Sequence, residues 1–457
     1  MTHDWNGKSV LVVGLGDTGI SSARWLARAG ARVRAADTRA APPALGAFRA
    51  ELPHARVSLG AFDLSLLEGV DAIAASPGVA LREPLLAAAL ARGIEVVGDV
   101  EILARELARR PQGPRVIGVT GTNGKSTVTA LAAAMGAAAG LESVAAGNIG
   151  LPVLDALAGF ERDGFPELLV LELSSYQLET TSSLAVDAAT MLNLTQDHLD
   201  RYDSIADYGR AKERIFMHCR RRVVNRDDAA SLAMGDASAF TFGLGVPHGE
   251  REWGMDAGRE ALLHGAGKIV AAREMAMPGL HNAANGLAAH ALATAVGLAG
   301  EPLARALREF KGLAHRVEEV AAANGVRFYD DSKGTNVGAS VAALEGFTQP
   351  VVLIAGGDGK GQDFSPLVPA VKRHARAVVL IGRDAPAIAR ALEPAGVPVQ
   401  RAATLEDAVL AAFGLAREGD AVLLSPACAS FDMFRNYGHR GEVFAAAARR
   451  LAQSRES

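Results

Sequence analysis

Short apolar runs alternate along the chain with longer segments of helical periodicity. Seven such runs cover residues 10–13, 33–36, 116–119, 168–173, 351–355, 377–381 and 421–424. Continuous apolar runs of this length are typical of strands that are buried on both faces of a parallel sheet. Their alternation with helical segments predicts βαβ units and therefore an α/β fold.

Chain length and two connectors predict how the fold is divided. At roughly 150 residues per domain, 457 residues correspond to about three domains. Connectors with Pro or Gly lie at 110–114 and 311–313, next to segments whose pattern predicts another strand. We therefore predict an N-terminal Rossmann-like domain over 1–110, a central P-loop ATPase-like domain with a mixed sheet over 111–312, and a C-terminal Rossmann-like domain over 313–457.

Composition excludes several classes of protein. Hydrophobic residues make up 49% and charged residues 21%, which fits a folded globular enzyme, and the net charge of -4 gives no general attraction to nucleic acid. Cys219 and Cys428 are too far apart in the chain to suggest a disulfide framework or a thiolate metal site. The N-terminus lacks the pattern of a signal peptide, and His290 interrupts the Ala-rich run after Gly286. We expect a cytoplasmic protein that binds neither nucleic acid nor membrane.

The first glycine-rich loop matches a dinucleotide fingerprint. The strand at 10–13 leads into GLGDTG at 14–19, and Asp37 ends the next strand, about 20 residues further on. Taken alone, this pattern indicates a dehydrogenase. A helix N-terminus offers N–H donors to any diphosphate, however, so the pattern does not fix which nucleotide binds.

A second loop changes that interpretation. The strand at 116–119 is followed by TGTNGKST at 120–127 and an Ala-rich helix. The backbone N–H groups of such a loop hold phosphates, Lys125 reaches the β- and γ-phosphates, and the hydroxyl of Ser126 or Thr127 binds Mg²⁺. Val119 stands where the strict Walker pattern has glycine. Two nucleotide loops in one chain suggest two nucleotides with different roles, and hydride transfer leaves the second loop unexplained.

Three ionisable residues of the central segment interrupt apolar patterns. Glu172 lies in an apolar strand, where an unpaired carboxylate costs several kcal/mol, so we expect a cation beside it. His198 follows a strand expected at 190–194, where ligands of parallel sheets gather. Lys212 shares a three-four-three spacing with apolar neighbours over 205–215. It either faces inward or extends its amine to the surface, and the pattern favours neither.

Several motifs resemble those of the Mur ligases. The motifs shared with that family as a whole are GTNGKST at 121–127, GNIG at 147–150, LELSSYQ at 171–177, HNAAN at 281–285 and HR at 315–316. Those that resemble its D-glutamate-adding branch are the loop at 14–19 with DTR at 37–39, SPG at 76–78, DSKGTN at 331–336, GGDGK at 356–360 and SPACASFDMF at 425–434. The resemblance therefore spans all three predicted domains.

The resemblance implies an ATP-dependent amide-bond ligase of peptidoglycan precursor synthesis. The first domain would bind UDP-N-acetylmuramoyl-L-alanine rather than NAD, and D-glutamate would be joined to its L-alanyl carboxylate through an acyl phosphate. We expect a monomer that uses ATP and two Mg²⁺ ions. The implied catalytic residues are Lys125, Glu172, His198 and Lys212, and the metal ligands are Ser126, Glu172, His198 and Lys212 as a carbamate.

The resemblance also implies the binding residues for each substrate. ATP would contact Gly121, Thr122, Asn123, Gly124, Lys125, Ser126, Thr127, Asn285, Arg316 and Asp331. The UDP substrate would contact Leu15, Gly16, Asp17, Thr18, Asp37, Thr38, Arg39, Gly78, Asn148 and His198. D-glutamate would contact Lys333, Thr335, Lys360, Ser430, Phe431 and Tyr437, although Gly334 and Tyr437 stand where the family commonly has alanine and phenylalanine.

Other functions stay open at this point. A related ligase that adds a different residue, or that acts on folate, is the nearest competitor, and the segment 425–434 discriminates between them. A nicotinamide-dependent oxidoreductase would bind NAD at the first loop. A P-loop switch module would hydrolyse nucleotide without an amino-acid substrate.

Overall fold

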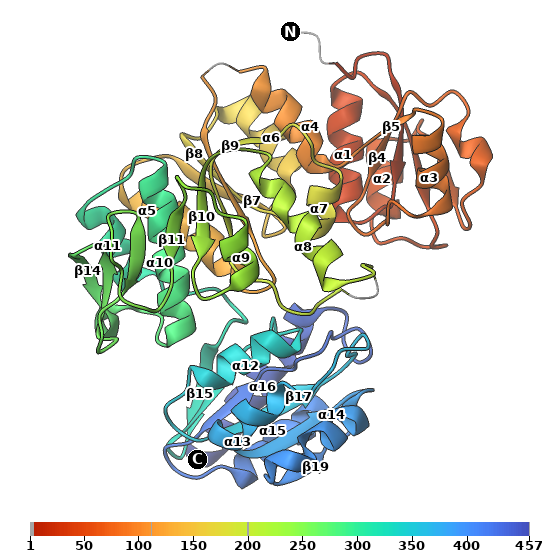
Figure 1. Ribbon diagram of the computed structural model, residues 1–457. Helices are drawn as coiled ribbons and strands as arrows, with labels where there is room; N and C mark the ends of the chain where they lie inside the picture. Colours follow the sequence, from red (N-terminus) through yellow and green to blue (C-terminus); the bar gives the residue numbers. More distant parts are fainter. Residues whose placement is uncertain (1–3, 111, 199–200, 457) are drawn as a thin grey trace.

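The computed structural model describes residues 4–110, 112–198 and 201–456, and it contains three sheets in chain order (Figure 1). Six of the seven predicted apolar runs lie wholly in strands, and the run 168–173 extends one residue beyond the strand Leu168–Glu172, so the predicted α/β class is confirmed. The domain boundaries at 110/111 and 312/313 stay predictions. Residues 1–3, 111 and 457, which belong to the predicted domains, lie outside the described residues.

The N-terminal sheet is parallel, with the order β3-β2-β1-β4-β5. Every residue of β1 is buried, as a continuous Val- and Leu-rich run in such a sheet requires. The order reverses beside β1, which is where ligands bind in doubly wound sheets. Its elements are β1 (Ser9–Val13), α1 (Asp17–Arg28), β2 (Arg32–Asp37), α2 (Leu45–Glu51), β3 (Val57–Leu59), η1 (Leu64–Leu67), β4 (Ala72–Ala75), α3 (Pro84–Ala91) and β5 (Glu95–Val97).

The central sheet has nine strands in the order β14-β13-β12-β11-β10-β9-β6-β8-β7 and is mixed, as predicted. Strands β6 to β12 pair with one another in parallel. Strand β13 pairs in antiparallel fashion with β12 on one side and with β14 on the other. Its strands are β6 (Arg115–Thr120), β7 (Ser143–Gly147), β8 (Leu168–Glu172), β9 (Ala185–Met191), β10 (His218–Asn225), β11 (Phe240–Phe242), β12 (Glu252–Met255), β13 (Ala261–His264) and β14 (Gly267–Ala271). Its helices are α5 (Lys125–Ala138), α6 (Val153–Asp163), α7 (Ser175–Glu179), α8 (Ile205–Glu213), η2 (Arg214–Phe216), α9 (Ala229–Ala233), η3 (Ala272–Glu274), α10 (Leu280–Ala295) and α11 (Glu301–Glu309).

The C-terminal sheet has the order β15-β16-β20-β17-β18-β19 and is parallel except for the β15–β16 pair. Its elements are β15 (Glu318–Ala323), β16 (Val326–Asp330), α12 (Val337–Glu345), β17 (Val351–Gly356), α13 (Leu367–His374), β18 (Ala375–Ile381), α14 (Ala385–Leu392), η4 (Glu393–Ala395), β19 (Val399–Arg401), α15 (Leu405–Leu415), β20 (Ala421–Leu424) and α16 (Tyr437–Glu456). Figure 1 shows this unit, in blue, beneath the central one.

Two details of the central segment differ from the prediction. The strand expected at 190–194 begins at Ala185 and ends at Met191, so His198 lies in a loop seven residues beyond it. Ile205 is exposed rather than buried, because it is the first residue of α8, where the helix has only begun to pack. Tyr208 and Ile215 of the same stripe are buried as predicted, and so is Lys212, for which the sequence left both orientations open.

The first two units share one hydrophobic core, whereas the third has its own. Helix α4 (Asp99–Ala108) follows the first sheet and packs on α6 and α7 of the central unit. Ion pairs join α1 to α6 at the rim of this contact, Arg24 to Asp155 and Arg28 to Glu161, each at 2.6 Å. The polar contacts of the third unit with the central one are described below. No helix of the described residues is long and apolar enough to cross a membrane.

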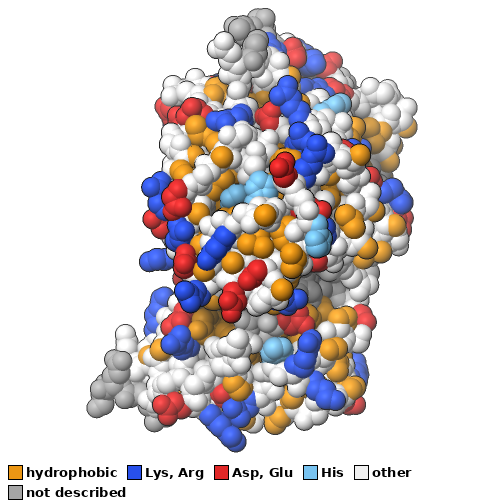
Figure 2. All heavy atoms as spheres, turned by 60° about the vertical axis from the view of Figure 1, so that its left-hand side comes forward, with side chains coloured by type: hydrophobic (Ala, Val, Ile, Leu, Met, Phe, Trp, Pro, Cys, Tyr) orange, Lys and Arg blue, Asp and Glu red, His pale blue; other side chains and the backbone are white. Residues whose placement is uncertain are grey.

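The charged side chains on the face drawn in Figure 2 are interspersed by sign. Lys and Arg side chains do not form one continuous positive patch on this face, which agrees with the small net charge of the chain.

We predict that Asp99→Asn stabilises the protein at pH 7.5. Asp99 is buried at the contact of α4 with α7, its Oδ2 accepts a bond from Gln177, and its Oδ1 has no partner. Burial raises the pKa of Asp99 to about 6. Because this folded value lies above the unfolded one, the carboxyl favours folding fully only below about pH 4 and loses this contribution as pH rises through 6.

Thermal melts of both proteins measure the effect. The gain from Asp99→Asn should reach about 2–3 kcal/mol at pH 7.5. It should shrink toward pH 4, where the native carboxyl is already neutral. A gain that does not change with pH would show that charge is not its cause.

Candidate active site

The phosphate-type loop lies between β6 and α5 as predicted. Gly121 and Gly124 both have positive φ angles, and a Cβ at Gly124 would come within 2.6 Å of Asn285 Oδ1. Val119 is a buried residue of β6, so the loop begins after the strand. Lys125 opens α5, and its Nζ donates to the carbonyls of Gly121 and Thr122 at 2.8 Å each.

A carboxylate and a lysine lie buried beside this loop. Glu172 ends β8, next to Val119 in register; its Oε1 accepts from Asn148 Nδ2 at 2.8 Å, while its Oε2 has no partner. Lys212 is 1% exposed, and its Nζ donates to Gly121 O at 2.7 Å. Burial first, and then repulsion by Lys125, place the pKa of Lys212 well below its ordinary value. The lysine therefore faces inward, where burial favours the neutral form of its amine.

His198 faces the same cleft from the loop after β9. Its φ is 55°, its Nδ1 lies 2.7 Å from Tyr176 Oη, and its Nε2 lies 3.7 Å from Asp197 Oδ2. Burial is the main cause that lowers the pKa of His198, and the nearby lysines lower it further. The imidazole is thus held neutral at physiological pH.

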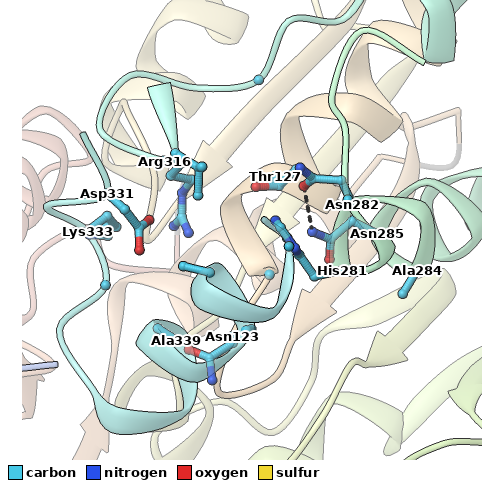
Figure 3. Close-up of a pocket in the computed structure, with 18 of the residues that line it drawn as sticks. Asn123, Thr127, His281, Asn282, Ala284, Asn285, Arg316, Asp331, Lys333 and Ala339 are labelled. Atoms are coloured by element: carbon cyan, nitrogen blue, oxygen red, sulfur yellow. Dashed lines mark hydrogen bonds between the residues drawn. The ribbon is translucent and has the colours of Figure 1, made fainter. Parts of the chain in front are cut away.

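Residues from distant segments complete a cleft of about 1520 Å³. Figure 3 shows Arg316, Asp331 and Lys333 on one side of the cleft, and Thr127 with Asn285 on the other. Arg316 Nη2 donates to Ser126 Oγ at 2.6 Å and joins the third unit to the loop. Burial raises the pKa of Asp331 to about 7 and lowers that of Lys333 to about 8.

The ten residues expected at ATP thus gather in one place. Eight of them line the cleft, Ser126 Oγ accepts from Arg316, and Gly121 O accepts from Lys125.

The residues expected at the UDP substrate divide into two groups. Asn148 and His198 line the cleft, whereas the others lie at the carboxyl edge of the N-terminal sheet. There Asp37 Oδ2 accepts from Leu15 N at 2.7 Å, and both oxygens accept from Arg39. The Arg39 guanidinium is the main cause that lowers the pKa of Asp37 to about 2. Gly16, Asp17, Thr18 and Thr38 lie beside this pair, and Gly78 is exposed beyond Pro77, which reaches the cleft.

The residues expected at D-glutamate gather less closely. Lys333 and Thr335 line the cleft, and Lys360 reaches its edge, 3.9 Å from Asp197 Oδ1. Tyr437 lies under Lys333, with the ammonium 3.8 Å from the ring centre. Ser430 is buried and Phe431 is 74% exposed, and neither lines the cleft.

Gly334 packs too closely for a larger residue. A Cβ there would come within 2.6 Å of Asp331 Oδ2 and 2.8 Å of Ser425 Oγ, and those two groups bond to each other at 2.6 Å. Glycine at this position, where the family commonly has alanine, therefore matches the local packing.

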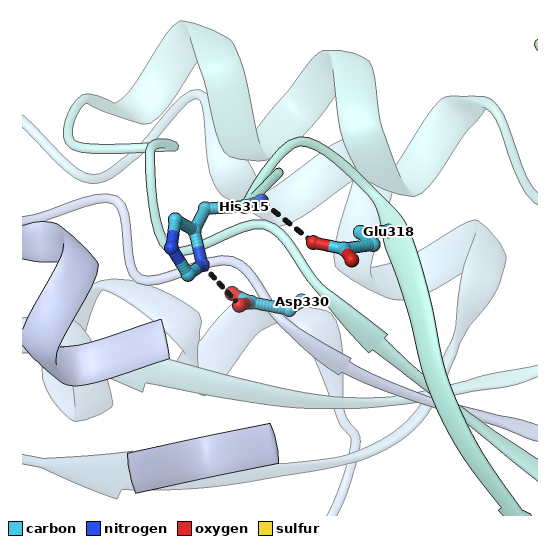
Figure 4. A group of neighbouring side chains, drawn as sticks. All are labelled: His315, Glu318 and Asp330. Atoms are coloured by element: carbon cyan, nitrogen blue, oxygen red, sulfur yellow. Dashed lines mark hydrogen bonds and ion pairs between the residues drawn. The ribbon is translucent and has the colours of Figure 1, made fainter. Parts of the chain in front are cut away.

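His315, Glu318 and Asp330 bring their ligand-type atoms within 4.8 Å of one another (Figure 4). Those atoms already have protein partners: His315 Nδ1 bonds Asp330 Oδ2 at 2.6 Å, and Glu318 Oε2 accepts from His315 N at 3.0 Å. Both bonds fix the backbone just before Arg316. The cluster is accordingly an anchor for Arg316 rather than a metal site.

Sequence reasoning did not assign roles to two residues that hold the site together. Asn336 Nδ2 donates to Asn123 Oδ1 at 3.1 Å and to Asp197 Oδ2 at 3.2 Å, which joins the third unit to the central one. Arg440 is 1% exposed and donates to Ser332 and to Cys428 O, so it ties the segment of Lys333 to that of Ser430. These contacts join residues that are far apart in the chain, so only the folded structure shows the roles of Asn336 and Arg440.

The cleft suits a nucleotide with a divalent cation. A helix N-terminus preceded by glycines offers N–H donors to phosphates. The unpartnered Oε2 of buried Glu172 and the hydroxyl of Ser126 are the hard oxygen ligands that Mg²⁺ prefers. These residues fit both groups chemically.

Comparison with protein families matches most of the chain, in three parts. Residues 8–98 match the Mur ligase MurD-like N-terminal domain, 119–293 the Mur ligase middle domain, and 315–428 the Mur ligase glutamate ligase domain. The order of these matches agrees with the three sheets.

Curated relatives and solved structures agree with this. A UDP-N-acetylmuramoylalanine–D-glutamate ligase of Nitrosospira multiformis is 54% identical, with 98% of this chain and 97% of that protein covered. One of Thiobacillus denitrificans is 52% identical, with 98% of each covered. MurF of Acinetobacter baumannii has the same fold with a TM-score of 0.60 at 17% identity, covering 99% of this chain and 93% of that one.

Proposed function

Since this chain belongs to the Mur ligase family, we propose that it is the ATP-dependent ligase that adds D-glutamate to UDP-N-acetylmuramoyl-L-alanine in peptidoglycan precursor synthesis. The observation that carries the proposal is the convergence of Lys125, Lys212 and Glu172 from the central unit with Arg316 and Lys333 from the third unit on one cleft. Such a site positions a triphosphate between two substrates.

The reaction has two steps. The L-alanyl carboxylate attacks the γ-phosphorus of ATP, which breaks the bond to the β–γ bridging oxygen, releases ADP and forms an acyl phosphate; the amine of D-glutamate then attacks the acyl carbon, and phosphate leaves. We assign Lys125 and Arg316 to the phosphates, because both are cations within reach of the loop. We assign Lys333 and Lys360 to the carboxylates of D-glutamate.

The amine of D-glutamate must lose its proton before it attacks. Lys333 and Lys360 would hold the two carboxylates, which leaves the amine free to approach the acyl carbon. Asp197 lies at the same edge of the cleft, 3.9 Å from Lys360. Its carboxylate is an oxygen acceptor to which the amine proton can pass.

We propose that two Mg²⁺ ions are held by Ser126, Glu172, His198 and a carbamylated Lys212. When bound, Mg²⁺ offsets the charge that develops on the phosphates. Glu172 supplies an oxygen without a protein partner, and Lys212 supplies an amine whose pKa is lowered by burial, which favours the neutral form to which CO₂ adds. We further propose that the enzyme works in the cytoplasm as a monomer, without nucleic acid or membrane, and that its domains divide at 110/111 and 312/313.

We expect phosphate release to require ATP, UDP-N-acetylmuramoyl-L-alanine and D-glutamate together. A panel of D-glutamate, L-glutamate, L-alanine and L-lysine at equal concentration measures the selectivity. Equal turnover with any of the other amino acids, or without one, would refute the proposal.

We also expect the N-terminal unit to bind UDP and not NAD, because Asp37 is already engaged by Leu15 and Arg39. Calorimetry on the full chain is the appropriate measurement, since the first unit shares its core with the central one. Arg39→Ala should weaken UDP binding, whereas Arg162→Ala, an exposed arginine of α6, should not. Tight NAD binding without a response to UDP would reverse the assignment.

A further inference from the structure

The phenol of Tyr176 lies where it can control the imidazole of His198. Tyr176 comes from α7, just after the strand that carries Glu172, and its Oη lies 2.7 Å from His198 Nδ1. Nδ1 is therefore engaged, and Nε2 is left facing Asp197 and the cleft. His198 has a positive φ, which a residue with a side chain adopts only where its surroundings hold it.

The Tyr176 ring is itself held in place by Arg201. The Arg201 guanidinium lies 4.3 Å from the ring centre, and Arg201 also pairs with Glu179. The same guanidinium donates to the carbonyls of Pro77 and Val79, in the loop from the N-terminal unit that reaches the cleft. Rotation of the Tyr176 ring away from His198 would therefore break its contact with a guanidinium that is itself fixed by bonds to the N-terminal unit.

We propose that Tyr176 is a positioning residue that fixes His198 as the tautomer with its proton on Nδ1, donated to Tyr176 Oη, and its Nε2 lone pair directed into the cleft. A histidine that binds a metal commonly donates its other ring N–H to a neighbouring acceptor, which sets both tautomer and orientation. Here the acceptor is a phenol oxygen. The proposal rests on the function proposed above, because it assigns His198 to the metal side of that site.

Tyr176→Phe removes only the oxygen and keeps the ring under Arg201. Tyr202→Phe is the matched control, because Tyr202 packs in the same aromatic cluster, 6.1 Å from Tyr176 between ring centres, and its hydrogen bond to His198 runs through its backbone N–H, which the substitution keeps. Both variants keep the apolar packing of the cluster.

Nitrogen-15 NMR of histidine-labelled, nucleotide-free full-length protein reads the tautomer, with the His198 signals assigned by their loss in His198→Gln. We expect the Nδ1–H form in the parent and in Tyr202→Phe, and a mixture of tautomers in Tyr176→Phe. Mn²⁺ binding in the presence of ADP, followed by electron paramagnetic resonance, should weaken about 10-fold in Tyr176→Phe alone. The kcat should fall with little change in KM for D-glutamate.

The proposal is overturned if Tyr176→Phe keeps the parental tautomer and Mn²⁺ affinity, if the parent carries its proton on Nε2, or if Tyr202→Phe has the same effects. Failure of the proposed function is distinguishable. It would appear in the parent protein as phosphate release that does not depend on D-glutamate, whatever the NMR spectra show.

Discussion

Replacing Lys212 with alanine is expected to lower the rate of ligation by about 10³-fold, equivalent to about 4 kcal/mol of transition-state stabilisation. Lys212 is fully buried, and its amine lies against the phosphate loop at Gly121 O. Burial places the pKa of this amine well below its ordinary value, which favours the neutral form, and only a neutral amine adds CO₂. The resulting carbamate supplies an anionic oxygen to the metal side of the cleft, which alanine cannot do.

Steady-state phosphate release and circular dichroism together measure this. Alanine suits a helix, so the fold should persist with a modest loss of stability from the cavity. Formate or acetate at high concentration should enter the vacated space and restore part of the activity. Arg210→Ala, on the exposed side of the same helix, is the matched control. Near-normal turnover of Lys212→Ala would mean that the lysine is only part of the packing.

Exchanging Glu172 for glutamine should reduce turnover by about 10²-fold or more without destabilising the nucleotide-free protein. The buried Oε1 keeps its bond from Asn148, and the change neutralises only the oxygen that has no partner. An unpaired buried charge costs free energy, so its removal should leave the melting temperature unchanged or higher. Loss of activity together with retained stability is the signature of a binding role.

Thermal melts with and without ADP and Mg²⁺ separate this role from a structural one. The melting temperature of the parent should rise when ADP and Mg²⁺ are added together. In Glu172→Gln, most of the rise that depends on Mg²⁺ should be lost. Glu167→Gln, in the exposed segment just before the same strand, should behave as the parent does. A drop of several degrees in the nucleotide-free Glu172→Gln protein would contradict the assignment.

The apolar pattern was sufficient to predict the fold class, because burial on both faces of a parallel strand leaves a continuous hydrophobic run in the sequence. The same pattern identified Glu172 and Lys212 as candidate site residues, since an ionisable side chain at an apolar position needs a partner. The prediction was wrong where exposure depends on position in the fold: Ile205 matches the periodicity of α8, but it starts the helix and is exposed. The antiparallel strands β12 to β14 are short and were not predicted.

By itself, the sequence determined the strands, the phosphate loop and the residue types of the site, because these depend on neighbours along the chain. Only the tertiary structure decided which distant side chains meet. Asn336 joins Asn123 and Asp197, Tyr176 holds His198, and Arg440 ties Ser332 to Cys428. Such contacts depend on how crossovers order the strands and on how the units dock, and the periodicity of one segment carries no information about either.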